Sequence, residues 1–266
     1  MISIQGVQAM LAFELRRAVT LQRMATTIVL ILFPPLMLAL MVLGPRAFGE
    51  EPSRELFPEF PTVFLLGISC ILSLLLWATP NVYSEMESKG WAFIACRPKG
   101  RTSLLLGKYI AAVVYSYVVC LLSASLCTLV AYWLDGYAKS TSFWLSLNGI
   151  FGLACIVYGA IFSLIGVLFQ KRGMVFAAGY ALLVELILGF VPAVINRITM
   201  RYHLQYLAVK WFDVLPEEVI QGMELVYGPI RSNAFHISVI LGAAAGVLFV
   251  ANIVIQRREY VTAEDV

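Results

Sequence analysis

Six apolar segments, each about as long as a helix that crosses a bilayer, constrain this chain more than any other feature. A spanning helix needs about 20 apolar residues, because every backbone N–H and C=O must be bonded within the segment where water is excluded. The composition agrees, with 61% hydrophobic and 13% charged residues, against about 45–50% and about 25% in soluble domains. We therefore predict an all-α, polytopic membrane protein with a single transmembrane domain. The predicted spans are Met24–Leu43, Thr62–Tyr83, Tyr109–Trp133, Leu147–Phe169, Met174–Ile195 and Phe235–Ile255.

Lys and Arg are distributed unevenly between the two sides of these spans. The side that carries both termini and residues 84–108 holds 12 of the 19 Lys and Arg residues, and the opposite side holds 7. Cytoplasmic loops are enriched in Lys and Arg, so we expect a multi-pass protein of the cytoplasmic (inner) membrane with both termini in the cytoplasm. The net charge of +3 sums a basic inner and a slightly acidic outer face, and it gives no indication of nucleic acid binding.

The N-terminal region combines an amphipathic segment with a proline pair. In residues 1–23, apolar residues recur at helical spacing while Glu14 and the arginines occupy other faces, which predicts a helix lying in the inner interface. In the first span, Pro34 and Pro35 remove backbone donors, so we expect a helix kink there. The kink is either a static bend or a hinge that lets the span splay.

Two later spans contain residues that are unusual inside a membrane. A charged Glu185 at a helix centre would cost about 2.5–3.5 kcal/mol on insertion scales, so its carboxyl group should face protein or water. It is either a neutral group hydrogen-bonded to a neighbouring span or part of a substrate or proton path. Gly242 and Gly246, one turn apart, favour close approach of another helix, which we expect within the chain more than from another copy.

The segment between the fifth and sixth spans, residues 196–234, is long for a connector. Leu215 to Val226 has Pro and acidic residues in a first turn and apolar residues on one face, which predicts a short interfacial or re-entrant outer helix, with a plain surface loop as the alternative. His203 and His236 are far apart in sequence and give little support to a metal site.

The five cysteines do not indicate a disulfide framework. Four fall within spans and Cys96 lies on the predicted cytoplasmic side, where thiols stay reduced. We expect them to act as small apolar packing residues. No catalytic constellation, nucleotide site or metal site can be named, so we predict a non-catalytic subunit that binds no cofactor itself.

Residues 84–108 are too organised for a simple connector. They begin with Ser84-Glu85-Met86-Glu87-Ser88-Lys89-Gly90 and continue through Arg97-Pro98 and Arg101 to Gly107-Lys108. With the Phe13-Glu14-Leu15-Arg16-Arg17 helix and six spans, this layout resembles the permease subunits of type-2 ABC exporters. The chain departs from that family in having Gly90-Trp91 where Gly-Thr is usual.

The resemblance implies a coupling helix in residues 84–108 that docks on a separate ATPase subunit, which holds the ATP and Mg. It also implies a second permease copy, as a homodimer or a heterodimer, within membrane lipids. In that reading, Trp91, Phe93 and Ile94 form the apolar anchor. Two alternatives are a proton-coupled secondary transporter that uses Glu185, and a structural or regulatory membrane subunit without transport. The charged and turn residues assigned to coupling are Glu85, Glu87, Lys89, Gly90, Arg97, Pro98 and Arg101.

Overall fold

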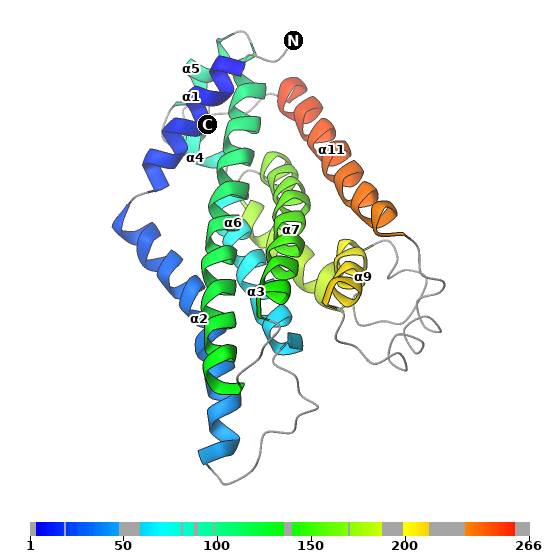
Figure 1. Ribbon diagram of the computed structural model, residues 1–266. Helices are drawn as coiled ribbons and strands as arrows, with labels where there is room; N and C mark the ends of the chain where they lie inside the picture. Colours follow the sequence, from blue (N-terminus) through cyan, green and yellow to red (C-terminus); the bar gives the residue numbers. More distant parts are fainter. Residues whose placement is uncertain are drawn as a thin grey trace.

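The computed structural model of this chain is built of helices, and the part it describes contains no strand (Figure 1). The expected all-α class is therefore confirmed. The described residues are 4–18, 20–47, 59–80, 82–87, 90–97, 99–135, 140–169, 171–187, 199–212 and 232–258.

In the described part of the chain, five helices are long and apolar enough to cross a membrane. They arise from apolar runs that satisfy their own backbone groups along most of their length. Their bounds are α2 Leu21–Ala47, α3 Glu59–Ala78, α6 Gly100–Asp135, α7 Ser140–Leu168 and α11 Asn233–Arg257.

The segment predicted as the fifth of six spans is shorter in the described structure. It forms α8, Gly173–Tyr180, which continues directly as a π-helix, η1, Ala181–Ile187. The rest of Met174–Ile195 lies outside the described residues. This apolar helix is therefore not among the five long ones.

Helix α7 forms the centre of the bundle, and α11 lies at its edge. The share of the spanning window that is buried is 67% for α7 and 17% for α11. At one end of α7, a Cβ added to Gly166 would lie 2.1 Å from the backbone oxygen of Thr79. Only glycine therefore allows α7 to approach the end of α3 this closely.

Three short or peripheral helices gather at one end of the bundle. Helix α1, Ile4–Ala18, packs against α6, and α4, Tyr83–Glu87, and α5, Trp91–Ala95, lie beside them (Figure 1). The C-terminal end of α11 is joined to the same region by Arg101. Its guanidinium donates to the carbonyls of Ile255, Gln256 and Arg258 at 3.4, 3.1 and 3.2 Å, which satisfies acceptors left open at a helix end.

Helix α9, Met200–Phe212, packs against α7 and α11. Ser146 at the start of α7 donates to the carbonyl of Trp211, at 3.1 Å. The outer helix expected from Leu215 to Val226 lies outside the described residues.

The sequence predicted a kink at the proline pair of α2 and a close helix contact at two glycines of α11. Pro34 and Pro35 are buried and α2 continues through them, so the kink and its use as a hinge stay predictions. In α11, a Cβ added to Gly242 or Gly246 would meet no atom within 4 Å. Among the described residues, these two glycines therefore face open space rather than the close contact within the chain that we expected.

Candidate functional site

The charged segment after α3 folds back onto the bundle in two short helices. Between α5 and α6 the chain turns sharply at Lys99, whose φ of 64° lies in the left-handed region. At the next position a Cβ on Gly100 would be 2.1 Å from the carbonyl oxygen of Ile94. This turn sets α5 directly against the first turns of α6.

A buried cluster of four charged residues ties α4 to α1 and α6. Lys108 Nζ lies 2.6 Å from Glu85 Oε1 and 3.3 Å from Glu14 Oε1. Arg17 reaches the same Glu85 oxygen at 3.5 Å. The side chains of Lys108, Glu85 and Glu14 are only 3%, 7% and 13% exposed. Two cations and two anions balance, which is the condition under which buried charges are tolerated.

Lys108 also donates a hydrogen bond to Ser84 Oγ, at 2.8 Å. The ammonium group of Lys108, in the third turn of α6, therefore has partners on α1 and on two neighbouring residues of α4. The amphipathic helix, the segment 84–108 and the longest helix of the bundle are joined at this point.

Trp91 is the second attachment of this segment, and it is only 4% exposed. It belongs to a core cluster formed by residues of α6, α7 and α11, among them Leu104, Val167 and Ile255. The guanidinium of Arg101 lies 5.6 Å from the centre of its ring, within the range of a cation–π contact.

The remaining residues assigned to coupling are divided between surface and interior. Phe93 is 77% exposed, and Glu87 and Arg97 are also exposed. Ile94 is partly buried against the Trp91 cluster, and the carbonyl of Gly90 accepts from its N–H at 3.3 Å. Lys89 and Pro98 lie outside the described residues.

Trp91 and Glu85 were expected to contact another subunit, and that expectation stays a prediction. In the described chain both are buried, and they hold α5 and α4 to the bundle. The sequence pattern was ambiguous because a five-residue helix has one buried and one exposed face, and Trp91 and Phe93 are both aromatic. Of the three proposed anchor residues, Phe93 is the exposed one.

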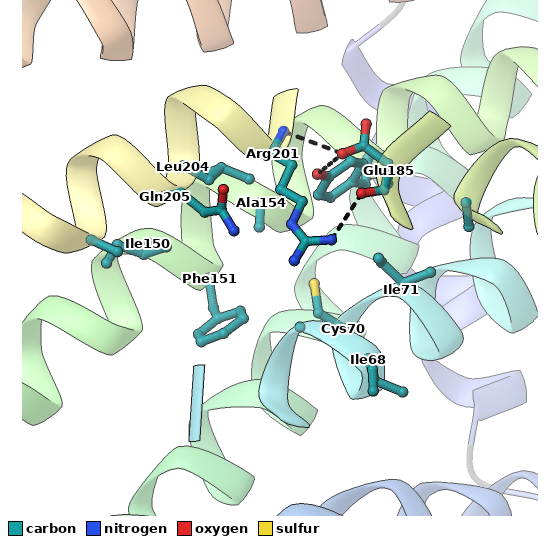
Figure 2. A pocket seen from close by; sticks show the side chains of 14 residues that line it. Ile68, Cys70, Ile71, Ile150, Phe151, Ala154, Glu185, Arg201, Leu204 and Gln205 are labelled. Carbon is teal, nitrogen blue, oxygen red and sulfur yellow. Dashed lines mark hydrogen bonds between the residues drawn. The ribbon is translucent and has the colours of Figure 1, made fainter. Parts of the chain in front are cut away.

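Glu185 forms a second site, in the interior of the bundle. Its carboxylate accepts hydrogen bonds from the hydroxyls of Tyr158 and Tyr180 at 2.7 and 2.9 Å. The backbone N–H of Arg201 donates to the same carboxylate at 3.2 Å, and its guanidinium donates to the Glu185 carbonyl at 2.9 Å (Figure 2). Glu185 is 2% exposed, so these partners replace the water that its carboxylate loses.

Tyr158, Glu185 and Arg201 line one wall of a pocket bounded by α3, α7, η1 and α9. The pocket has an empty volume of about 860 Å³, including its open mouth. Its walls are mainly apolar, with Glu185 and Arg201 on one side and Ile68, Cys70 and Ile71 of α3 facing them (Figure 2). An apolar cavity with a few converging polar groups is the usual form of a small-molecule site.

Sequence reasoning found Glu185 but missed its partners. Tyr180 lies five residues before it, and residues five apart lie on different faces of an α-helix. The i→i+5 bonding of a π-helix brings them together. Arg201 was missed because it was assigned to an outer connector.

Two histidines that seemed unrelated in sequence also meet. His203 of α9 and His236 of α11 are buried, with 2.8 Å between their Nδ1 atoms. Tyr206 stacks on His236 at 4.2 Å between ring centres. One Nδ1 must donate and the other accept, so this contact joins α9 to α11.

Comparisons of this chain with protein-family models, curated proteins and solved structures found no match.

Proposed function

We propose that this chain is the permease subunit of an ABC exporter. In the proposed complex, two permease copies form a translocation path in the cytoplasmic membrane, and two separate ATPase subunits supply energy from the cytoplasm. The chain would cross the membrane six times, with the segment from Met174 as the fifth span and both termini inside. The layout of the sequence and the position of Phe93 support this proposal.

Phe93 is the observation that carries the proposal. A phenylalanine that is 77% exposed would gain from burial, and aromatic residues dominate protein–protein interfaces. Its helix α5 is anchored from behind by Trp91 and flanked on the surface by Glu87 and Arg97. A fixed apolar tip with charges of both signs around it suits a soluble partner better than the hydrocarbon of a bilayer.

The attachments of α4 and α5 give a route by which a push on Phe93 would reach the membrane helices. Trp91 contacts the ends of α6, α7 and α11, and Glu85 is bonded to Lys108 of α6. The route acts through rigid contacts and needs no nucleotide on this chain. The pocket beside Glu185 lies between α3, α7 and α9, where a rearrangement of the long helices would change its shape.

The second permease copy is part of the same proposal. Helix α11 exposes Phe249 and Val250, with Gly242 and Gly246 facing open space. In lipid, packing between helices depends on close backbone approach at small residues. Within the described chain, no helix packs closely against these two glycines. We therefore propose that they contact another copy of the chain or lipid.

Photocrosslinking from position 93 in native membranes tests the ATPase docking. We expect a crosslink to a P-loop ATPase, and Phe93→Ala should weaken co-purification of that ATPase by about 1–3 kcal/mol, or roughly 5–150-fold. Trp133→Ala is the matched control, because Trp133 is 82% exposed at the other end of α6. Crosslinks to lipid alone, or an equal effect of both variants, would refute the docking.

A proton-coupled transporter is the second candidate, favoured by the buried carboxylate of Glu185 on the pocket wall. This candidate requires the carboxylate to gain and lose a proton during transport. Glu185→Gln would then abolish transport and leave folding intact. Transport that survives in this variant but stops when the ATPase is removed would exclude the second candidate.

A further inference from the structure

Three cysteines from three different helices meet in the core of the bundle. Cys70 of α3, Cys120 of α6 and Cys155 of α7 have their sulfur atoms within 4.8 Å of one another, and Cys70 Sγ lies 3.6 Å from Cys155 Sγ. All three are free thiols, and their residues are 1%, 1% and 0% exposed. No disulfide joins them, so the three thiols are available together.

We propose that Cys70, Cys120 and Cys155 bind one soft, monovalent metal ion such as Cu(I) in a trigonal site. An ion in the plane of three sulfurs, about 2.3 Å from each, keeps the sulfurs about 4 Å apart. The Cys70–Cys155 separation of 3.6 Å is slightly shorter than this value, and none of the three exceeds 4.8 Å. Small rotamer adjustments of the thiols would therefore complete the site without moving the helices.

The number and softness of the ligands select the type of ion. Cysteine sulfur favours Cu(I) and other soft ions, whereas a structural Zn²⁺ takes four ligands in a tetrahedron. Among the described residues, no fourth His, Cys, Asp or Glu joins the three cysteines. The site therefore matches an ion that is stable with three sulfur ligands.

Binding of the ion is coupled to loss of protons, because cysteine binds a metal as the thiolate. The first proton that leaves balances the one positive charge that enters. Each further proton that leaves adds a negative charge to the low-dielectric interior, which is costly, so we expect binding to depend on pH.

Cys70 gives the ion a path to the cluster. It belongs both to the cluster and to the wall of the open pocket beside Glu185 (Figure 2). The ion would enter through the pocket, bind first to Cys70 and then bridge to the two deeper sulfurs. Bound there, it would join α3, α6 and α7.

Cys127 provides a matched control within the same helix as Cys120. It is also buried and reduced, but it is not part of the three-sulfur group. If the three cysteines were only packing residues, Cys120 and Cys127 would respond alike to metal. The exposed Cys96 serves as the control for adventitious binding at a surface thiol.

The test is an anaerobic Cu(I) titration of the purified full-length protein against a chromogenic Cu(I) chelator, with X-ray absorption to count the sulfur ligands. We expect one ion per chain with three sulfur neighbours. The single variants Cys70→Ser, Cys120→Ser and Cys155→Ser should each weaken binding more than about 10-fold, because even changes outside the ligand shell cost about 10–100-fold. Cys127→Ser and Cys96→Ser should bind as the unaltered protein does.

Three outcomes would overturn the proposal. The first is no binding above that of a Cys70→Ser/Cys120→Ser/Cys155→Ser variant. The second is binding that depends on Cys96. The third is full binding in Cys120→Ser, which would reduce the site to a pair. Cys120→Ala and size-exclusion elution of every variant separate loss of the site from loss of the fold.

Discussion

Lys108 Nζ lies 2.6 Å from Glu85 Oε1, and both side chains are almost fully removed from solvent. This ion pair joins the third turn of α6 to α4. A buried pair of this kind is strongly destabilising when one partner is lost, because the other charge stays buried. The position of the segment 84–108 therefore depends on charge as well as on apolar packing.

Replacement of Lys108 by Met should destabilise the protein by about 3–5 kcal/mol. The carboxylates of Glu14 and Glu85 would remain buried with Arg17 alone to balance them. The melting temperature in detergent measures the effect, and the exposed Lys171→Met is the control. Adding Glu85→Gln to Lys108→Met should restore part of the loss. No recovery would show that the charge balance does not govern stability here.

Trp91→Ala should lower the stability of the protein. Phe93→Ala should leave stability almost unchanged and weaken association with the ATPase. Trp91 is buried and Phe93 is 77% exposed, so Trp91→Ala should cost about 3–5 kcal/mol of stability, and Phe93→Ala should cost almost none. Thermal unfolding and ATPase co-purification of the two variants should be measured together. Equal loss of stability in both would contradict the burial of Trp91.

Labelling of one native cysteine, Cys96, tests the proposed topology. Cys96 is exposed, whereas Cys70, Cys120, Cys127 and Cys155 are buried. A membrane-impermeant maleimide should label Cys96 in inverted vesicles and leave it unlabelled in intact cells. In a Cys96→Ser background, Trp133→Cys should show the reverse pattern. Labelling of Cys96 in intact cells would show that the chain has the opposite orientation to the one proposed.

Comparing Glu185→Gln with Glu185→Ala should show how much of the stability depends on the hydrogen bonds of this side chain and how much on its charge. Gln keeps an oxygen that accepts from Tyr158 or Tyr180, so it should cost about 1 kcal/mol. Ala leaves both buried hydroxyls without this partner, at about 1–3 kcal/mol for each. The measurement is thermal stability alongside transport. Equal stability of the two variants would mean that the carboxylate bonds contribute nothing.

His236→Phe should loosen α9 from α11. The phenyl ring can keep the stacking with Tyr206 but cannot bond to Nδ1 of His203. The expected cost is about 1–3 kcal/mol, with faster hydrogen exchange in α9 than in α7. His236→Asn, which retains a polar side chain, should lose less. Unchanged exchange in α9 would show that the histidine contact does not hold the two helices.

The sequence was sufficient for the class of fold and for the five long helices of the described chain. Apolar length alone identified α2, α3, α6, α7 and α11, because a span must satisfy its own backbone. Their ends were less accurate. Helix α6 begins at Gly100, nine residues before the predicted start at Tyr109, because the polar first turns are fixed by Arg101 and Lys108 rather than by lipid.

The contacts between distant residues could not be predicted. Lys108 was read as the end of the predicted coupling segment, yet its partner Glu14 lies more than ninety positions earlier. The Cys and His groupings depend on which helices are neighbours, and helix order in space is not a property of the local pattern. Glu185 was found because an acid in an apolar span is costly wherever it lies.

The π-helix that carries Glu185 is bonded i→i+5, so each hydrogen-bonded turn holds one residue more than in an α-helix. Tyr180 and Glu185 are five apart, a spacing that would put them on different faces of an α-helix. Loss of one residue between them, such as Leu183, would leave them four apart, which is the spacing of neighbours on one face of an α-helix. The polar corner of this pocket therefore depends on the number of residues between its members as well as on their identity.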